Sequence, residues 1–278
     1  MWPAKCPDSV SAGGANMRAK AWLAVAFAGV LGVGAVVAQP PKGGAPKTEA
    51  PKAPEGAKIT DPLATMIAEA KGALGKTRDY TCTFTRQEVV KGALSAEQVA
   101  EMKVRLNPGG VYVRFARPDA IAGMEVAYTA ARKNDKFRYR PAGVGGAKGF
   151  RTLDLDDSKF LAENRHPVAD WTMSAVVDRV ATAAAREKAL NNPVEVYTGD
   201  FQFAGRNVTR YEIFTRRPHA FRHAHRTLVY VDKETKLPLR YEAYDQPKSG
   251  AAVGDLFEAY SFSDVKRNVG LGEAVFDL

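Results

Sequence analysis

Apolar and polar residues alternate with period two along much of the chain, which is the pattern of antiparallel strands with one buried face. The clearest case is 228–245, where two such runs flank a polar turn and Leu228, Leu239 and Tyr241 stand among charged neighbours. The pattern predicts strands at 80–84, 102–106, 111–115, 124–128, 136–140, 194–198, 201–203, 208–215, 226–232, 237–244 and 256–263.

Two segments have helical spacing instead. From 62 to 74, apolar residues recur every three or four positions, with Asp61 as a suitable N-cap, Pro62 at the first helical position and Gly75 at the end. A longer helix is expected at 170–190, and a short one at 158–163. The inward face of the longer helix comprises Met173, Val176, Val177, Val180 and Ala184. Strands and helices in this order predict an α+β domain over 61–278.

The N-terminal 60 residues lack this patterning. Residues 1–38 resemble a secretory signal peptide, with a basic start after Met17 and an apolar run that ends near Ala38. On this interpretation 1–16 are an over-extended start. An uncleaved membrane anchor is the alternative, although glycines interrupt the apolar run and a span needs about 20 apolar residues. Residues 39–60 are rich in Pro, Lys and Ala and are expected to be a disordered linker.

The net positive charge of the chain favours anionic binding partners. The formal net charge is +9, and loss of 1–38 would remove three basic residues and one acidic residue. The polar face of the first sheet half is also basic, because Lys and Arg alternate with its apolar residues. A basic exported protein meets anionic lipid headgroups or acidic envelope polymers. Nucleic acid is not expected as a partner in that compartment.

The candidate motifs for catalysis, a cofactor or a metal each lack residues that the motif requires. The Gly-rich stretch 143–149 lacks the Ser or Thr that follows the lysine of a phosphate loop. A calcium loop starting at Asp154 would need a glycine where Lys159 stands and a glutamate where Arg165 stands. Cys82 lies in an alternating run and is expected to be a buried core residue. The chain is therefore predicted not to be an enzyme and to need no cofactor.

Three of the four histidines cluster near 219–225 among arginines. A pair of histidines on one strand face suits a metal, but no acidic or cysteine ligand stands nearby and the arginines oppose a cation. We predict no metal and an anion or headgroup contact, which would strengthen as the histidines protonate. The candidate residues are Arg217, Arg222, His223 and His225.

The order of signal peptide, amphipathic helix, strands, central helices and further strands resembles the periplasmic lipoprotein-carrier fold. The chain is also similar to an uncharacterised bacterial envelope family near that fold, on the segments 80–87, 102–108, 111–115, 123–128, 229–240, 242–244, 258–262 and 268–271. The resemblance implies a strongly curved antiparallel sheet, a half-open barrel, with helices covering its concave face. It further implies an apolar cavity that holds acyl chains or lipidated ligands.

Two functions follow as hypotheses. The first is an exported, monomeric binding protein that holds lipid or lipoprotein acyl chains in that cavity. The alternative is an envelope sensor or interaction module that uses its basic surface and carries no lipid. Residues of the alternating strands would form the cavity wall, unless they are ordinary core beneath the helices: Phe84, Val104, Val113, Phe115, Val126, Tyr128 and Phe137.

Overall fold

The structure is a computed structural model, which describes residues 61–143, 146, 149–220 and 222–277. The expected signal peptide (1–38) and linker (39–60) lie outside the described residues. Within the described part, no helix is both long enough and apolar enough to cross a lipid bilayer.

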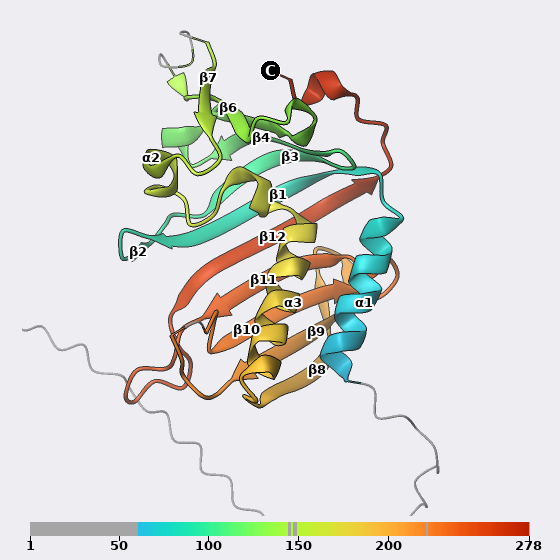
Figure 1. Ribbon diagram of the computed structural model, residues 1–278, viewed down its shortest axis with the longest axis vertical. Coiled ribbons are helices and arrows are strands. Elements are labelled where there is room, and N and C mark those ends of the chain that lie inside the picture. Colours follow the sequence, from blue (N-terminus) through green and yellow to red (C-terminus); the bar gives the residue numbers. More distant parts are fainter. Residues whose placement is uncertain (1–60, 144–145, 147–148, 221, 278) are drawn as a thin grey trace, which may run out of the picture. The chain divides into compact units, whose positions relative to one another are not determined.

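The strands form one twelve-stranded antiparallel sheet within the described residues, in the order β7-β6-β5-β4-β3-β1-β12-β11-β10-β9-β8, with β2 paired to β1 alone. Their bounds are β1 Asp79–Val90, β2 Ala93–Leu94, β3 Gln98–Leu106, β4 Gly109–Arg117, β5 Glu125–Thr129, β6 Lys136–Arg140, β7 Arg151–Asp154, β8 Val194–Phe203, β9 Arg206–Thr215, β10 Arg226–Asp232, β11 Pro238–Tyr244 and β12 Leu256–Arg267. The two end strands, β7 and β8, do not pair with each other, so the sheet is curved but open (Figure 1).

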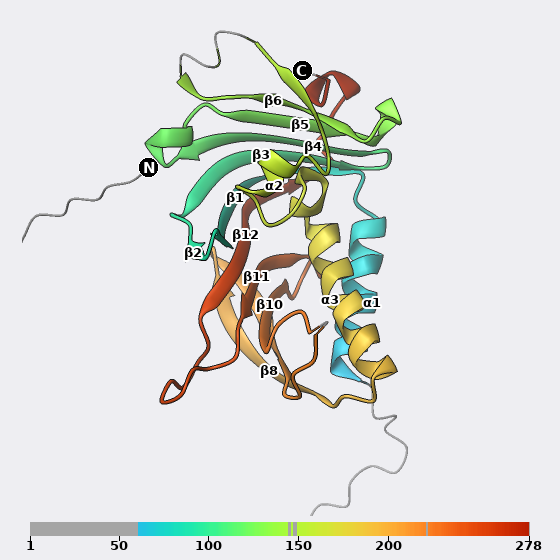
Figure 2. The same ribbon diagram turned by 60° about the vertical axis from the view of Figure 1, so that its left-hand side comes forward.

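The helices lie on the concave face of this sheet, and Figure 2 shows α1 and α3 side by side across its lower half. The helical elements are α1 Pro62–Gly75, η1 Asp119–Ile121, η2 Ala130–Arg132, α2 Ser158–Leu161, η4 Val168–Trp171, α3 Met173–Ala189 and η5 Glu273–Val275. An open antiparallel sheet with helices on its concave side confirms the predicted α+β fold class.

Local signals fix most element ends. Asp61 caps α1, because its Oδ1 accepts hydrogen bonds from the backbone N–H groups of Leu63 (2.9 Å) and Ala64 (3.3 Å). In the β10–β11 hairpin, Asp232 Oδ1 accepts from the N–H groups of Glu234 (2.8 Å) and Thr235 (2.9 Å). These side chains satisfy backbone donors that the turn and the helix end would otherwise leave free.

Several predicted boundaries are wrong: β1 and β12 extend beyond their predicted ends, β3 begins at Gln98 rather than 102, and β2 and β7 were not predicted. The helix expected at 170–190 begins only at Met173, because Thr172 has extended backbone angles and its Oγ1 accepts from Ala175 N as an N-cap. Trp171 consequently belongs to the preceding η4 turn. The strands expected at 194–198 and 201–203 are one strand, β8, since Gly199 and Asp200 continue the pairing with β9.

One continuous core lies between the sheet and the helices, and in its upper half it surrounds Trp171, which is fully buried. Its ring lies near those of Phe84 (6.5 Å between centroids), Phe115 (6.3 Å) and Phe160 (5.9 Å). Cys82 is also buried, which confirms its predicted role as a core residue. Burial in these apolar surroundings raises the pKa of the Cys82 thiol.

Candidate functional site

The lower half of the concave face is less tightly filled, because α3 presents the small side chains of Ala183, Ala184 and Ala185 there. A groove of about 570 Å³ runs between the start of α1, the end of α3 and the edge strand β8. This volume lies within the range of about 300–1,000 Å³ that is usual for small-molecule sites. Its apolar lining includes Leu63, Ile67, Ala184, Ala185, Val194 and Val196.

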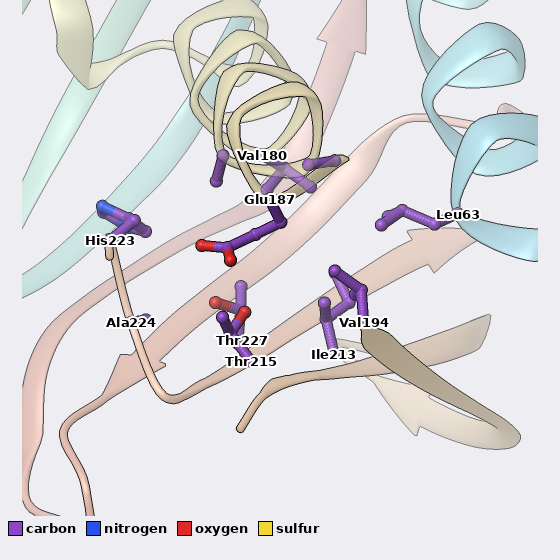
Figure 3. A pocket seen from close by; sticks show the side chains of 11 residues that line it. Leu63, Val180, Glu187, Val194, Ile213, Thr215, His223, Ala224 and Thr227 are labelled. Carbon is purple, nitrogen blue, oxygen red and sulfur yellow. The ribbon is translucent and has the colours of Figure 1, made fainter. Parts of the chain in front are cut away.

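A small cavity of about 20 Å³ lies next to this groove, beneath α3 (Figure 3). Leu63, Ala184 and Val194 border both the groove and the cavity. The cavity has room for about one water molecule. A slender ligand in the groove would therefore reach the interior after displacing only the side chains at this shared wall.

One wall of the cavity is polar and carries a buried carboxylate. Glu187 of α3 is 3% exposed, and Figure 3 shows its carboxylate directed toward Thr215 and Thr227. Its Oε1 lies 2.8 Å from His219 Nε2, and its Oε2 accepts a 2.5 Å hydrogen bond from Asn192 Nδ2. These contacts join the end of α3 to the segment between β9 and β10.

A second carboxylate, Glu258 of β12, is fully buried nearer the middle of the sheet. Tyr241 of β11 donates a 2.6 Å hydrogen bond to its Oε1, and His166 Nε2 lies 2.7 Å from its Oε2. His223 Nε2 and Arg179 Nη1 lie 3.3 Å and 3.7 Å from Oε1. Glu258 thus ties α3 and two loops to the central strands.

The electrostatics of this cluster favour the charged forms. Burial acts to raise the pKa of Glu258, but hydrogen bonds from His166 and His223, together with the charge of Arg179, hold it well below its ordinary value of 4.5. Burial acts to lower the pKa of Arg179, and Glu258 outweighs that effect, so the net shift is upward. The first half of α3 is therefore held by a buried ion pair, whereas its end borders the groove.

Two inward residues of β1 extend the polar cluster. Arg86 is 3% exposed, and it donates to Gln98 Oε1 (2.7 Å) and Asn164 Oδ1 (2.6 Å) while lying 3.9 Å from the centre of the Trp171 ring. Glu88 Oε2 accepts from the backbone N–H of Arg165 at 2.9 Å. The cluster thus closes one side of the aromatic core with polar contacts.

A family model described as a protein of unknown function, DUF1571, matches residues 77–278. The chain belongs to this family. The match confirms the expected membership of a family of unknown function. A search of curated proteins finds no match to the chain.

Several solved structures resemble this DUF1571 chain at low identity. An uncharacterized conserved protein from Thermus thermophilus has a TM-score of 0.46 at 10% identity, covering 78% of this chain and 94% of its own. The lipoprotein LppX from Mycobacterium tuberculosis gives 0.43 at 12%, covering 77% and 99%. A putative outer membrane lipoprotein-sorting protein domain from Vibrio parahaemolyticus gives 0.34 at 13%, covering 77% and 97%. Similarity at this level does not assign a ligand to the DUF1571 chain.

The residues predicted to form a cavity wall lie together on the concave face of the DUF1571 fold. Tyr128 is partly exposed and the other six are at most 2% exposed, beneath η4 and α2. They pack against one another and Trp171 in the core. The groove and the small cavity lie in the other half of the sheet. The set concerned is Phe84, Val104, Val113, Phe115, Val126, Tyr128 and Phe137.

The four residues predicted to contact an anion do not share one surface. Arg217 is exposed, and Arg222 donates to Gln246 Oε1 at 3.2 Å. His223 turns inward to Glu258, and His225 packs beside the ring of Phe214 at 6.0 Å. The described residues of 217–225 are not in a strand, so His223 and His225 do not share a strand face as predicted. Burial and the charge of Arg222 lower the pKa of His225.

The basic outer face has acidic partners from the C-terminal segment. Arg105 Nη2 lies 2.5 Å from Glu273, and Arg132 Nη2 lies 2.5 Å from Asp277. Phe276 is fully buried between them, beside Tyr112 and Ala127. The segment thereby reduces the positive potential that the strand sequences alone predict for this face.

Several polar site residues were missed although the pattern contained a signal. Arg86 and Glu88 continue the period-two alternation of Tyr80, Cys82 and Phe84, which places them on the inward face. Glu187 stands three positions after Ala184 and so continues the inward stripe of α3. Only the apolar residues of each inward-facing series had been assigned to the interior. The partners of Glu258 come from distant segments, and no local pattern indicates them.

Proposed function

We propose that this protein is an exported, non-enzymatic binding protein that holds a single apolar chain in the groove between α1, α3 and β8. The observation that carries this proposal is the wall shared by groove and cavity, formed by Leu63, Ala184 and Val194. Groove and cavity together would offer a path from solvent to the interior once the side chains at this wall move. A lipid or the acyl chain of a lipoprotein is the ligand class that fits such a path.

Burial of hydrocarbon favours a ligand with an acyl or alkyl chain. Each buried methylene contributes about 0.8 kcal/mol, so about ten of them supply roughly 8 kcal/mol before the costs of ordering the chain. The side chains of Leu63 and Val194 would have to move, since the cavity holds only about one water molecule. Because Glu258 holds the first half of α3, we expect the movement at α1 and the end of α3.

The alternative, a sensor or interaction module with a basic working surface, has less support. Arg105 and Arg132 on the outer face already pair with Glu273 and Asp277. The candidate residues of the 217–225 segment are dispersed between the interior and the surface. We therefore place the binding of an apolar chain first.

The proposal predicts saturable binding of a neutral apolar probe. Titration of the full chain with N-phenyl-1-naphthylamine should give one site with a micromolar Kd, which corresponds to about −8 kcal/mol. Unlabelled dodecanol should displace the probe. Absence of saturable fluorescence at any protein concentration, with no lipid found by mass spectrometry of an organic extract, would refute the proposed function.

A further inference from the structure

The cavity next to the groove has an apolar end and a polar end (Figure 3). Leu63, Val194 and Ile213 lie on the side toward the groove. Glu187, Thr215, Thr227 and His223 lie on the opposite side, away from the groove. A ligand that enters from the groove would meet these hydrogen-bonding groups with its leading end.

These polar groups retain free bonding capacity. A carboxylate accepts hydrogen bonds at about four positions. His219 and Asn192 occupy two of those of Glu187. Thr215 and Thr227 line the cavity, and both residues are 8% exposed. Polar side chains around a cavity of this size are usually bridged by a water molecule or a ligand.

We propose that this polar end binds the terminal hydroxyl of a neutral long-chain amphiphile, whose hydrocarbon part lies in the groove. The inference rests on the proposed function and specifies the ligand class. A hydroxyl donates one hydrogen bond and accepts others, so it can donate to Glu187 and accept from a threonine. Its size matches a cavity of about 20 Å³, which holds about one water oxygen.

A terminal hydroxyl differs from a carboxylate in charge and from a methyl ether in its hydrogen-bond donor. A fatty carboxylate would stand beside the buried carboxylate of Glu187, and two like charges shielded from water repel strongly. A methyl ether has the same chain but no donor, so it would leave the acceptor positions of Glu187 unused. A hydrogen bond to a charged acceptor is worth about tenfold to a hundredfold in affinity.

The test is displacement of bound N-phenyl-1-naphthylamine from the full chain by dodecanol, dodecanoate, dodecyl methyl ether and dodecylamine. Dodecanol should displace the probe at a concentration at least about tenfold lower than dodecanoate and dodecyl methyl ether. The double variant Thr215→Val/Thr227→Val should reduce this preference for the alcohol and leave ether binding unchanged. Thr182→Val, on the exposed side of α3, is the matched control and should leave all four affinities unchanged.

The outcomes separate the two proposals. If the probe binds but the four compounds compete equally, or if dodecylamine competes best, the hydroxyl site is refuted while the apolar groove stands. If neither the probe nor any competitor binds, both proposals fail. An alcohol preference that survives intact in the double variant would also overturn the inference.

Discussion

Replacing Glu258 with alanine should lower the free energy of unfolding by about 3–5 kcal/mol. The substitution leaves the buried guanidinium of Arg179 without its counter-charge, which lies 3.7 Å away in the native protein. It also deprives Tyr241 of the acceptor for its 2.6 Å hydrogen bond. Unpaired buried charges and donors are costly because nothing in the interior replaces the water that they have lost.

Urea unfolding of the full chain, followed by tryptophan fluorescence, measures this change. Asp200→Ala is the control, because Asp200 forms an exposed ion pair with Lys233 at 2.6 Å and its loss should cost no more than about 1 kcal/mol. Equal effects of the two substitutions would show that the Glu258 cluster does not hold the helices to the sheet.

The same residue should make stability depend on pH in a defined direction. The pKa of Glu258 is lowered on folding, so its contribution is fully present above its ordinary value of 4.5. That contribution is lost as the pH falls through the lowered folded-state pKa. The stability difference between wild type and Glu258→Gln should therefore narrow as the pH falls below the ordinary value of 4.5.

Replacing Ala184 with tryptophan should reduce probe affinity by about tenfold or more. Ala184 borders both groove and cavity, so an indole there occupies the space that the proposed path requires. Because the groove is open to solvent, the larger side chain can extend into it, and the overpacking cost should stay at or below about 1–3 kcal/mol. The measurement is titration with N-phenyl-1-naphthylamine, together with urea unfolding to verify folding.

Ala189→Trp provides the matched control for this substitution. Ala189 is an exposed residue of the same helix, and the groove lining does not include it. Both substitutions carry the same cost in helix propensity, so a difference between them reports on the groove. Unchanged binding in Ala184→Trp would place the ligand elsewhere.

Much of the fold could be predicted from local patterns. Period-two alternation located the strands, and the β10–β11 hairpin pairs Leu228 with Glu242 and Val229 with Tyr241, as two runs around a polar turn require. Asp61 and Pro62 marked the start of α1 correctly. Errors fell at Thr172 and at 199–200, where capping and strand pairing override simple periodicity, and the strands β2 and β7 were not predicted.

The candidate site was far less predictable. His166 contacts Glu258, 92 positions away, and the Tyr260 hydroxyl donates a hydrogen bond to Glu88, 172 positions away. Only the folded chain brings these residues together. The groove depends on the gap that Ala184 and Ala185 leave beside α1, and no sequence pattern specifies such a gap. Apolar residues of the upper strands were predicted to line a cavity, because a tightly packed core and a cavity wall have the same residue composition.

The most direct test of the account is to locate a bound chain. A dodecanol analogue with a photoreactive diazirine near the middle of its chain can be crosslinked to the full chain, and the modified residues can be identified by mass spectrometry. The account predicts labelling of α1, the end of α3 and β8, at or next to Leu63, Ala184 and Val194. Labelling confined to the outer face of the sheet, or spread evenly over the surface, would contradict it.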